Sequence, residues 1–150
     1  MGLLNSNAIH VAGAAALALV VSVAVAEGSE AKISDAWIRA LPSGLPAGGY
    51  FTLHNGGAKP LTLTGASSAA CGMLMLHKSD NTGGMMHMED VTKVDVPAGG
   101  TVKFAPGGYH LMCMDPAPSI KPGGKVNVTL SFSDGSSVGA AFAVRSASGR

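Results

Sequence analysis

Short apolar runs, each closed by a cluster of turn-forming residues, follow one another from residue 33 to residue 144. The 150-residue chain holds 21 glycines and 8 prolines, residue types that end strands and build tight turns. The segment Val126–Phe132 alternates strictly between apolar and polar side chains, which is the period of a strand with one buried face. No long amphipathic helical pattern follows residue 26. The sequence therefore predicts an all-β sandwich or barrel.

Nine segments fit this strand pattern, and glycine, proline, asparagine or aspartate lies in most of the gaps between them. They are Ile33–Arg39, Gly49–His54, Leu61–Gly65, Met73–Lys78, Met85–Val91, Thr101–Phe104, Tyr109–Met114, Val126–Phe132 and Val138–Val144.

The N-terminal segment has the pattern of an export signal. An uncharged apolar run ends in Ala24-Val25-Ala26 before Glu27, as at a signal-peptide cleavage site. We expect a signal peptide at residues 1–26, a folded domain at 27–145, a short flexible tail at 146–150 and a periplasmic mature protein without a membrane span. An uncleaved anchor is the alternative, because no Lys or Arg precedes the run and its length approaches the minimum of roughly 17 residues for a membrane-spanning helix. No cysteine follows the run, so a lipid anchor is not indicated.

The charge pattern argues against several functions. The formal net charge is +1, only 13% of residues are charged, and the basic residues are scattered, so neither nucleic acid nor an anionic membrane is an expected partner. We find no Ser-His-Asp order, paired carboxylates or phosphate loop, and therefore expect no enzyme.

The segment Pro106–Asp115 places chemically distinctive side chains on one strand face. His110 and Met112 lie two residues apart and share a face. With the upstream residues they give the spacing His77-x10-Met88-x21-His110-x-Met112. Two imidazoles and two thioethers form a soft, neutral ligand set, which suits Cu(I) and is poor for Zn(II), Mg(II) or Ca(II). We therefore predict a copper(I) site.

Other methionines allow a less specific interpretation, since methionine commonly fills gaps in cores. Met86 shares the predicted face of Met88 and is an auxiliary ligand candidate. Met73 and Met75 are interpreted as packing residues, and Met114 as a core or rim residue.

The remaining histidines and cysteines are not predicted to bind the metal. His87 points away from the face of Met88 and should be solvated, and His54 has no assigned role. Cys113 has the opposite phase from His110 and should be a small buried residue. Whether it pairs with Cys71 is left open between a disulfide and two separate buried thiols, with the thiols favoured, because the sequence cannot establish the required Cα separation.

Several motifs resemble the periplasmic copper(I) chaperone family called PCuAC, over roughly residues 33–144. They are Ala36-Trp37-Ile38-Arg39, Ala47-Gly48-Gly49-Tyr50, Gly65-Ala66-Ser67-Ser68, Leu76-His77, Pro97-Ala98-Gly99-Gly100-Thr101-Val102 and Pro106-Gly107-Gly108-Tyr109-His110-Leu111-Met112. The resemblance implies a cupredoxin-like Greek-key sandwich and Cu(I) bound by His77, Met88, His110 and Met112. It also implies delivery of copper to the CuA site of cytochrome c oxidase, often alongside Sco-type proteins.

The chain departs from this family pattern at three places. Ser79 stands where many members have a methionine, and Met75 where an acidic residue is common. The tail at residues 146–150 contains neither His nor Met, so the second, Cu(II) site of some members is not expected.

Two other functions remain as alternatives. An electron-transfer cupredoxin would need a thiolate ligand beside its histidines, and here the only nearby cysteine is Cys113. A structural sandwich without metal would bind no stoichiometric copper.

Overall fold

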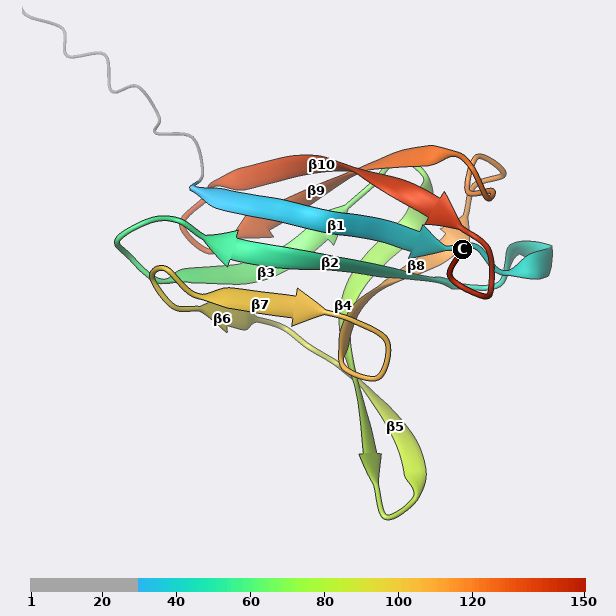
Figure 1. Ribbon diagram of the computed structural model, residues 1–150, viewed down its shortest axis with the longest axis horizontal. Helices are drawn as coiled ribbons and strands as arrows, with labels where there is room; N and C mark the ends of the chain where they lie inside the picture. The colour runs from blue at the N-terminus through green and yellow to red at the C-terminus, as the bar shows by residue number, and fades with distance from the viewer. Residues whose placement is uncertain (1–29) are drawn as a thin grey trace, which may run out of the picture.

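The computed structural model describes residues 30–150, which form a nearly all-β domain (Figure 1). Its elements are β1 (Ala31–Arg39), the short 3-10 helix η1 (Pro42–Gly44), β2 (Ala47–Asn55), β3 (Leu61–Ser67), β4 (Cys71–Thr82), β5 (Met85–Asp90), β6 (Val94–Val96), β7 (Thr101–Phe104), β8 (Tyr109–Pro116), β9 (Lys125–Phe132) and β10 (Ser137–Arg145). The predicted signal segment lies outside the described residues. Within them, no helix is long and apolar enough to cross a membrane.

The strands form one continuous hydrogen-bonded sheet. Its order is β5-β4-β8-β2-β1-β10-β9-β3-β6, and β7 pairs with the part of β2 that β8 leaves free. β1 and β10 run parallel, whereas the other paired strands of the described chain are antiparallel. The sheet folds over itself, so that side chains from distant strands enter one core. The prediction of an all-β, cupredoxin-like sandwich is confirmed.

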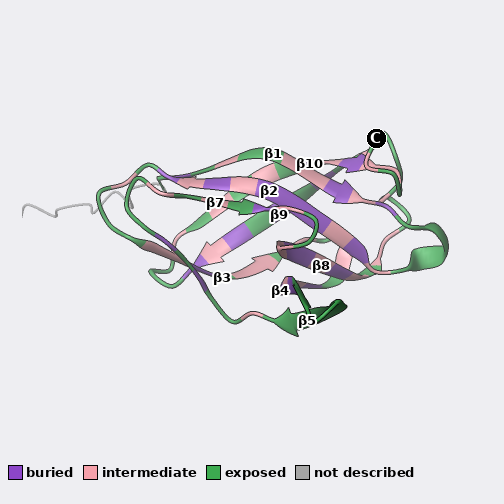
Figure 2. Ribbon diagram, turned by 60° about the horizontal axis from the view of Figure 1, so that its bottom comes forward, coloured by how far each residue is buried: buried purple, intermediate pink, exposed green. Residues whose placement is uncertain are grey.

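The core is built from the inward-facing residues of these strands. Phe51 stacks on Phe104 with ring centroids 4.3 Å apart, and Phe142 lies 5.7 Å from Phe51. Buried positions alternate with exposed ones along β9, as the sequence predicts (Figure 2). Burial of such apolar side chains is the main source of stability in a domain of this size.

Each of the nine predicted strands is present, with ends that differ by a few residues. The sequence pattern missed β6, which pairs Val94 with Leu63 and Val96 with Leu61. Three residues are too few to display a period of two, so this strand is defined by its partner rather than by its own pattern.

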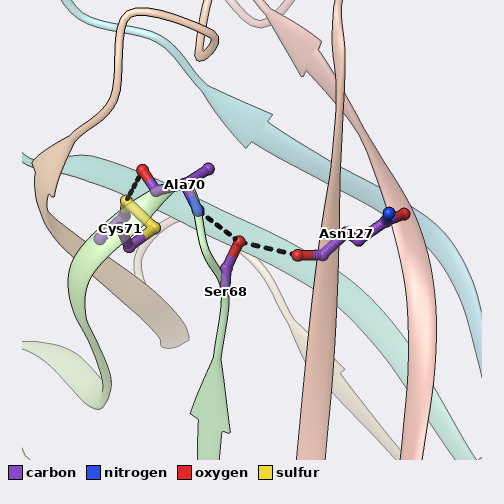
Figure 3. Close-up of a disulfide and its surroundings, with 5 residues drawn as sticks. Ser68, Ala70, Cys71 and Asn127 are labelled. Carbon is purple, nitrogen blue, oxygen red and sulfur yellow. Dashed lines mark hydrogen bonds between the residues drawn. A yellow bond between two sulfur atoms is a disulfide. The ribbon is translucent and has the colours of Figure 1, made fainter.

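The cysteines form a disulfide, which corrects the favoured interpretation of separate thiols. Cys71 at the start of β4 is bonded to Cys113 in β8, and their Cα atoms lie 5.4 Å apart. The turn before β4 is held by Ser68, whose Oγ donates to the carbonyl of Asn127 at 2.7 Å and accepts from the amide of Ala70 at 3.2 Å (Figure 3). The burial predicted for Cys113 is confirmed.

Removing the disulfide should destabilise the domain strongly. The bridge joins residues 42 positions apart, so its loss releases considerable chain entropy in the unfolded state. Replacing Cys71 and Cys113 together by alanine is expected to lower the free energy of unfolding by about 2–4 kcal/mol, as measured by urea denaturation. The wild type with its disulfide reduced should lose a similar amount. An unchanged unfolding midpoint in both would contradict a structural role for the bridge.

Candidate metal centre

A tight turn between β7 and β8 places His110 at the start of its strand. The amide of Gly108 donates to the carbonyl of Ala105 at 3.0 Å, with Pro106 and Gly107 between them. Gly107 has φ +84°, and proline followed by a glycine with positive φ is the pattern of a type II turn. The turn directs the chain into β8, with His110 as its second residue.

A second turn sets the position of Met88. Gly83 and Gly84 both have positive φ, +65° and +80°, as required by the two-residue type I′ hairpin turn. This turn pairs Thr82 with Met85 and thereby aligns the whole hairpin, so that Met88 lies opposite Ser79. The β4–β5 hairpin projects away from the body of the sheet (Figure 1).

The register between β4 and β8 brings the two predicted histidines together. His77 lies directly opposite His110, and Met112 opposite Met75, without a bulge between these pairs. The intervening pair, Leu76 and Leu111, points into the core. Because side chains alternate along a strand, both histidines and Met112 lie on the opposite face of this pair of strands. Met88, across from Ser79, belongs to the same face.

Each imidazole has one nitrogen beside an oxygen atom and another that is buried without a hydrogen-bond partner. In His110, Nδ1 lies 3.1 Å from the carbonyl oxygen of Gly108, and Nε2 has no partner. In His77, Nε2 lies 2.8 Å from Oδ1 of Asp90, although this contact lacks hydrogen-bond geometry, and Nδ1 has no partner. The rings meet edge to face with centroids 5.6 Å apart. Buried nitrogens without partners are costly, and a metal ion would satisfy them.

The environment of His110 favours its neutral, metal-binding form. Burial lowers the pKa of His110 below its ordinary value, and the nearby His77 lowers it further, while the carbonyl of Gly108 acts in the opposite direction. A lowered pKa keeps the imidazole uncharged at neutral pH. Its lone pair is then available to a metal.

A cleft of about 300 Å³ opens beside His110, and His77 is not among the residues that line it. His110, Met88 and Met112 line it together with residues of β1 and β2. In the part of the chain that the structure describes, the lining contains no carboxylate, and its one charged side chain is Arg39. Such a cleft suits a soft monovalent cation better than a hard divalent one.

Gly48 is needed for the shape of this cleft. It lies opposite Met112 on the neighbouring strand, and a Cβ atom at this position would lie 2.6 Å from the phenol oxygen of Tyr50. Without a side chain at Gly48, the phenol end of Tyr50 can occupy this space, and the Tyr50 ring centroid lies 6.5 Å from that of His110.

The other candidate ligands, Met86 and His87, lie on opposite faces of the β4–β5 hairpin. Met86 lies opposite Asn81 on the face of Met88, as predicted for an auxiliary ligand. His87 is exposed and pairs with Asp80 on the other face, which confirms its predicted position. His54 lies near the end of β2 that is remote from the cleft, and its Nδ1 is 2.9 Å from the hydroxyl of Thr101 in β7.

One interpretation of the methionines is wrong. Met73 is 58% exposed and cannot be a packing residue of the core. Met75 and Met114 are partly buried. The β4 strand is regular through this segment, so Met73, Met75 and His77 share one face.

Sequence reasoning missed Asp90. It lies opposite His77 at the end of β5, with its side chain 82% exposed. Its position two residues after Met88 was the available signal, since residues two apart share a face. Carboxylates beside a metal-binding imidazole orient the ring and strengthen it as a ligand.

Replacing Asp90 by asparagine should weaken Cu(I) binding about tenfold, because outer carboxylates typically contribute this much to metal affinity. The measurement is competition with a Cu(I) chelator. Glu89→Gln is the matched control, since Glu89 lies opposite Lys78 on the other face of the hairpin. Equal affinities for Asp90→Asn and the wild type would show that the carboxylate does not support the His77 ligand.

The chain matches the family described as "Putative lipoprotein LpqE-like" over residues 31–144. It is also 36% identical over 119 residues to "Putative lipoprotein Lxx21020" of Leifsonia xyli subsp. xyli (strain CTCB07), a match that covers 79% of this chain and 71% of that protein. Lipoproteins are exported, so the family indicates an exported protein. The prediction that no lipid anchor is present concerns residues outside the described range and stays a prediction.

Solved structures with the same fold are copper-binding domains. Apo-DR1885 from Deinococcus radiodurans is 30% identical, with a TM-score of 0.61 and 97% of each chain covered. Its Cu(I) form is 32% identical, with a TM-score of 0.61 and 75% and 76% covered. The copper-bound PCuAC domain from PmoF2 is 26% identical, with a TM-score of 0.62 and coverage of 80% of this chain and 96% of that one. The chain therefore belongs to the LpqE-like lipoprotein family, and its resemblance to PCuAC domains is confirmed by these solved structures.

Proposed function

We propose that this protein is a periplasmic chaperone that carries one Cu(I) ion between His77, Met88, His110 and Met112. The observation that carries the proposal is the cross-strand pair of histidines, whose Nδ1 in His77 and Nε2 in His110 are buried without partners. Both thioethers lie on the same face of the sheet. Copper-bound neighbours of 26% and 32% identity support the choice of metal.

The ligand set suits transport in an oxidising compartment. Thiolates there tend to form disulfides, as Cys71 and Cys113 have done in this chain. A thioether cannot form a disulfide and keeps its preference for soft copper. With neutral imidazoles, the four ligands themselves add no charge to that of the ion, and the charged neighbours Arg39 in the cleft and Asp90 beside His77 have opposite signs. Neutral ligands limit affinity, which permits release.

We further propose that the acceptor is the CuA site of cytochrome c oxidase, reached directly or through a Sco-type protein. Cu(I) binds thiolates more strongly than thioethers, because thiolate sulfur is both soft and negatively charged. Transfer of Cu(I) to an acceptor with cysteine ligands therefore lowers the free energy. Met88 is 53% exposed, so an incoming ligand can replace this sulfur first.

The alternative of an electron-transfer cupredoxin is disfavoured by Cys113. A blue-copper site needs a cysteine thiolate, but Cys113 is in a disulfide on the core side of β8. In the described chain, both cysteines are paired. A structural sandwich without metal would leave the buried imidazole nitrogens unexplained.

The transfer proposal can be tested with loaded protein and a reduced, copper-free CuA domain under anaerobic conditions. After separation, copper should be found mainly on the acceptor, with its characteristic spectrum after oxidation. An acceptor whose cysteines have been replaced by serine is the control and should receive none. Retention of copper by this protein against the intact acceptor would contradict the proposed delivery.

A further inference from the structure

Two methionine pairs extend the metal-binding face beyond the histidines. Met75 lies opposite Met112, and on the same face, one step further from the histidine pair, Met73 lies opposite Met114. Four thioethers thus belong to two neighbouring cross-strand pairs on one face of β4 and β8. Only Met112 among them belongs to the proposed His2Met2 site.

Packing against the core does not account for the most exposed of these side chains, Met73. Met73 is 58% exposed, whereas Leu74 and Cys113, which lie opposite one another between the two methionine pairs, point the other way and are buried in the core. An exposed apolar side chain in this position gains little by burial. A single exposed methionine needs no explanation. Here, however, two cross-strand pairs of methionines lie next to the proposed metal-binding histidines on the same face, and this arrangement does need one.

The register allows the sulfur atoms to converge. Directly opposite residues of an antiparallel pair have Cβ atoms about 4.5–5.5 Å apart, and diagonal neighbours on the same face lie within about 8 Å. Methionine has three rotatable bonds and adapts its sulfur position readily. The sulfurs of Met73, Met75 and Met114 can therefore meet at one point without movement of the backbone.

We propose that Met73, Met75 and Met114 form a second Cu(I) site made only of thioethers, adjoining the His2Met2 site through Met112. Three neutral sulfurs bind soft monovalent ions and reject Zn(II) and Cu(II). The site is weaker than the first, because it lacks imidazoles, is open to water and lies close to another positive ion. It goes beyond the proposed chaperone function and does not depend on the acceptor.

The test is anaerobic titration with Cu(I), and separately with Ag(I), which is soft and does not change oxidation state under these conditions. The wild type should bind two equivalents, the second at least tenfold more weakly than the first. The variant Met73→Leu/Met75→Leu/Met114→Leu should bind one equivalent with unchanged affinity. Leucine keeps the apolar volume, and thermal unfolding verifies that the variant is folded. Met85→Leu is the control, since Met85 is exposed on β5 outside this set.

A second variant separates this proposal from the chaperone proposal. His77→Ala/His110→Ala should lose the tight equivalent and keep the weak one, with sulfur-only coordination in X-ray absorption. If that variant bound no ion at all, the thioether site would not exist independently and the proposal would be overturned. Binding of a single equivalent by the wild type, or a second equivalent that survives the triple leucine substitution, would also overturn it. None of these outcomes would contradict the proposed His2Met2 site.

Discussion

Replacing Met88 and Met112 together by alanine, in a background in which Met86 is also alanine, is expected to lower Cu(I) affinity at least a hundredfold, equivalent to about 2.8 kcal/mol. The two sulfurs are half of the proposed ligand set, and they bind Cu(I) strongly but contribute almost nothing to Cu(II). Weak Cu(II) binding through His77 and His110 should therefore change little. The measurement is competition with a Cu(I) chelator, repeated with Cu(II) under air.

Met86 must be included in this experiment. It lies on the face of Met88, two residues away, and is exposed, so its flexible side chain can replace the lost sulfur. We expect Met88→Ala alone to have a small effect, and the triple variant with Met86→Ala and Met112→Ala to have the full effect. Equal losses of Cu(I) and Cu(II), or no loss of either, would show that the thioethers do not select the metal.

Replacing His110 by alanine is expected to lower Cu(I) affinity at least tenfold, about 1.4 kcal/mol. Its Nε2 is buried beside the cleft without a partner, and burial lowers its pKa so that the neutral ligand is present at neutral pH. Chelator competition at neutral pH measures the change. His77→Ala should act similarly.

The controls for this prediction are the two histidines that the fold places elsewhere. His87 lies on the other face of the β4–β5 hairpin, and His54 lies beside Thr101. Alanine at either position should leave Cu(I) affinity unchanged. If His87→Ala weakened binding as much as His110→Ala, the strand phase that defines the site would be wrong.

Strand phase and turn chemistry explain why so much of the site was predictable. Because side chains alternate along a strand, His110 and Met112 lie on one face and Cys113 on the other, independently of which strands pair with β8. The glycines of the β4–β5 turn then align Met88 with Ser79. These are local properties of the sequence, and the structure agrees with them.

Properties that depend on register between distant strands were not predictable in the same way. Whether Cys71 reaches Cys113 depends on how β4 lies against β8, and the sequence contains no local signal for that. Met73 was misinterpreted for the same reason, because its exposure depends on what covers the face of β4. The strand β6 exists only as a partner of β3.

X-ray absorption at the copper edge, on protein loaded with one equivalent of copper under reducing conditions, tests the central claim most directly. It reports the oxidation state and the ligand atoms together. The proposed site predicts colourless Cu(I) with two nitrogen and two sulfur ligands. Copper bound as Cu(II), or Cu(I) bound by nitrogen and oxygen alone, would contradict it.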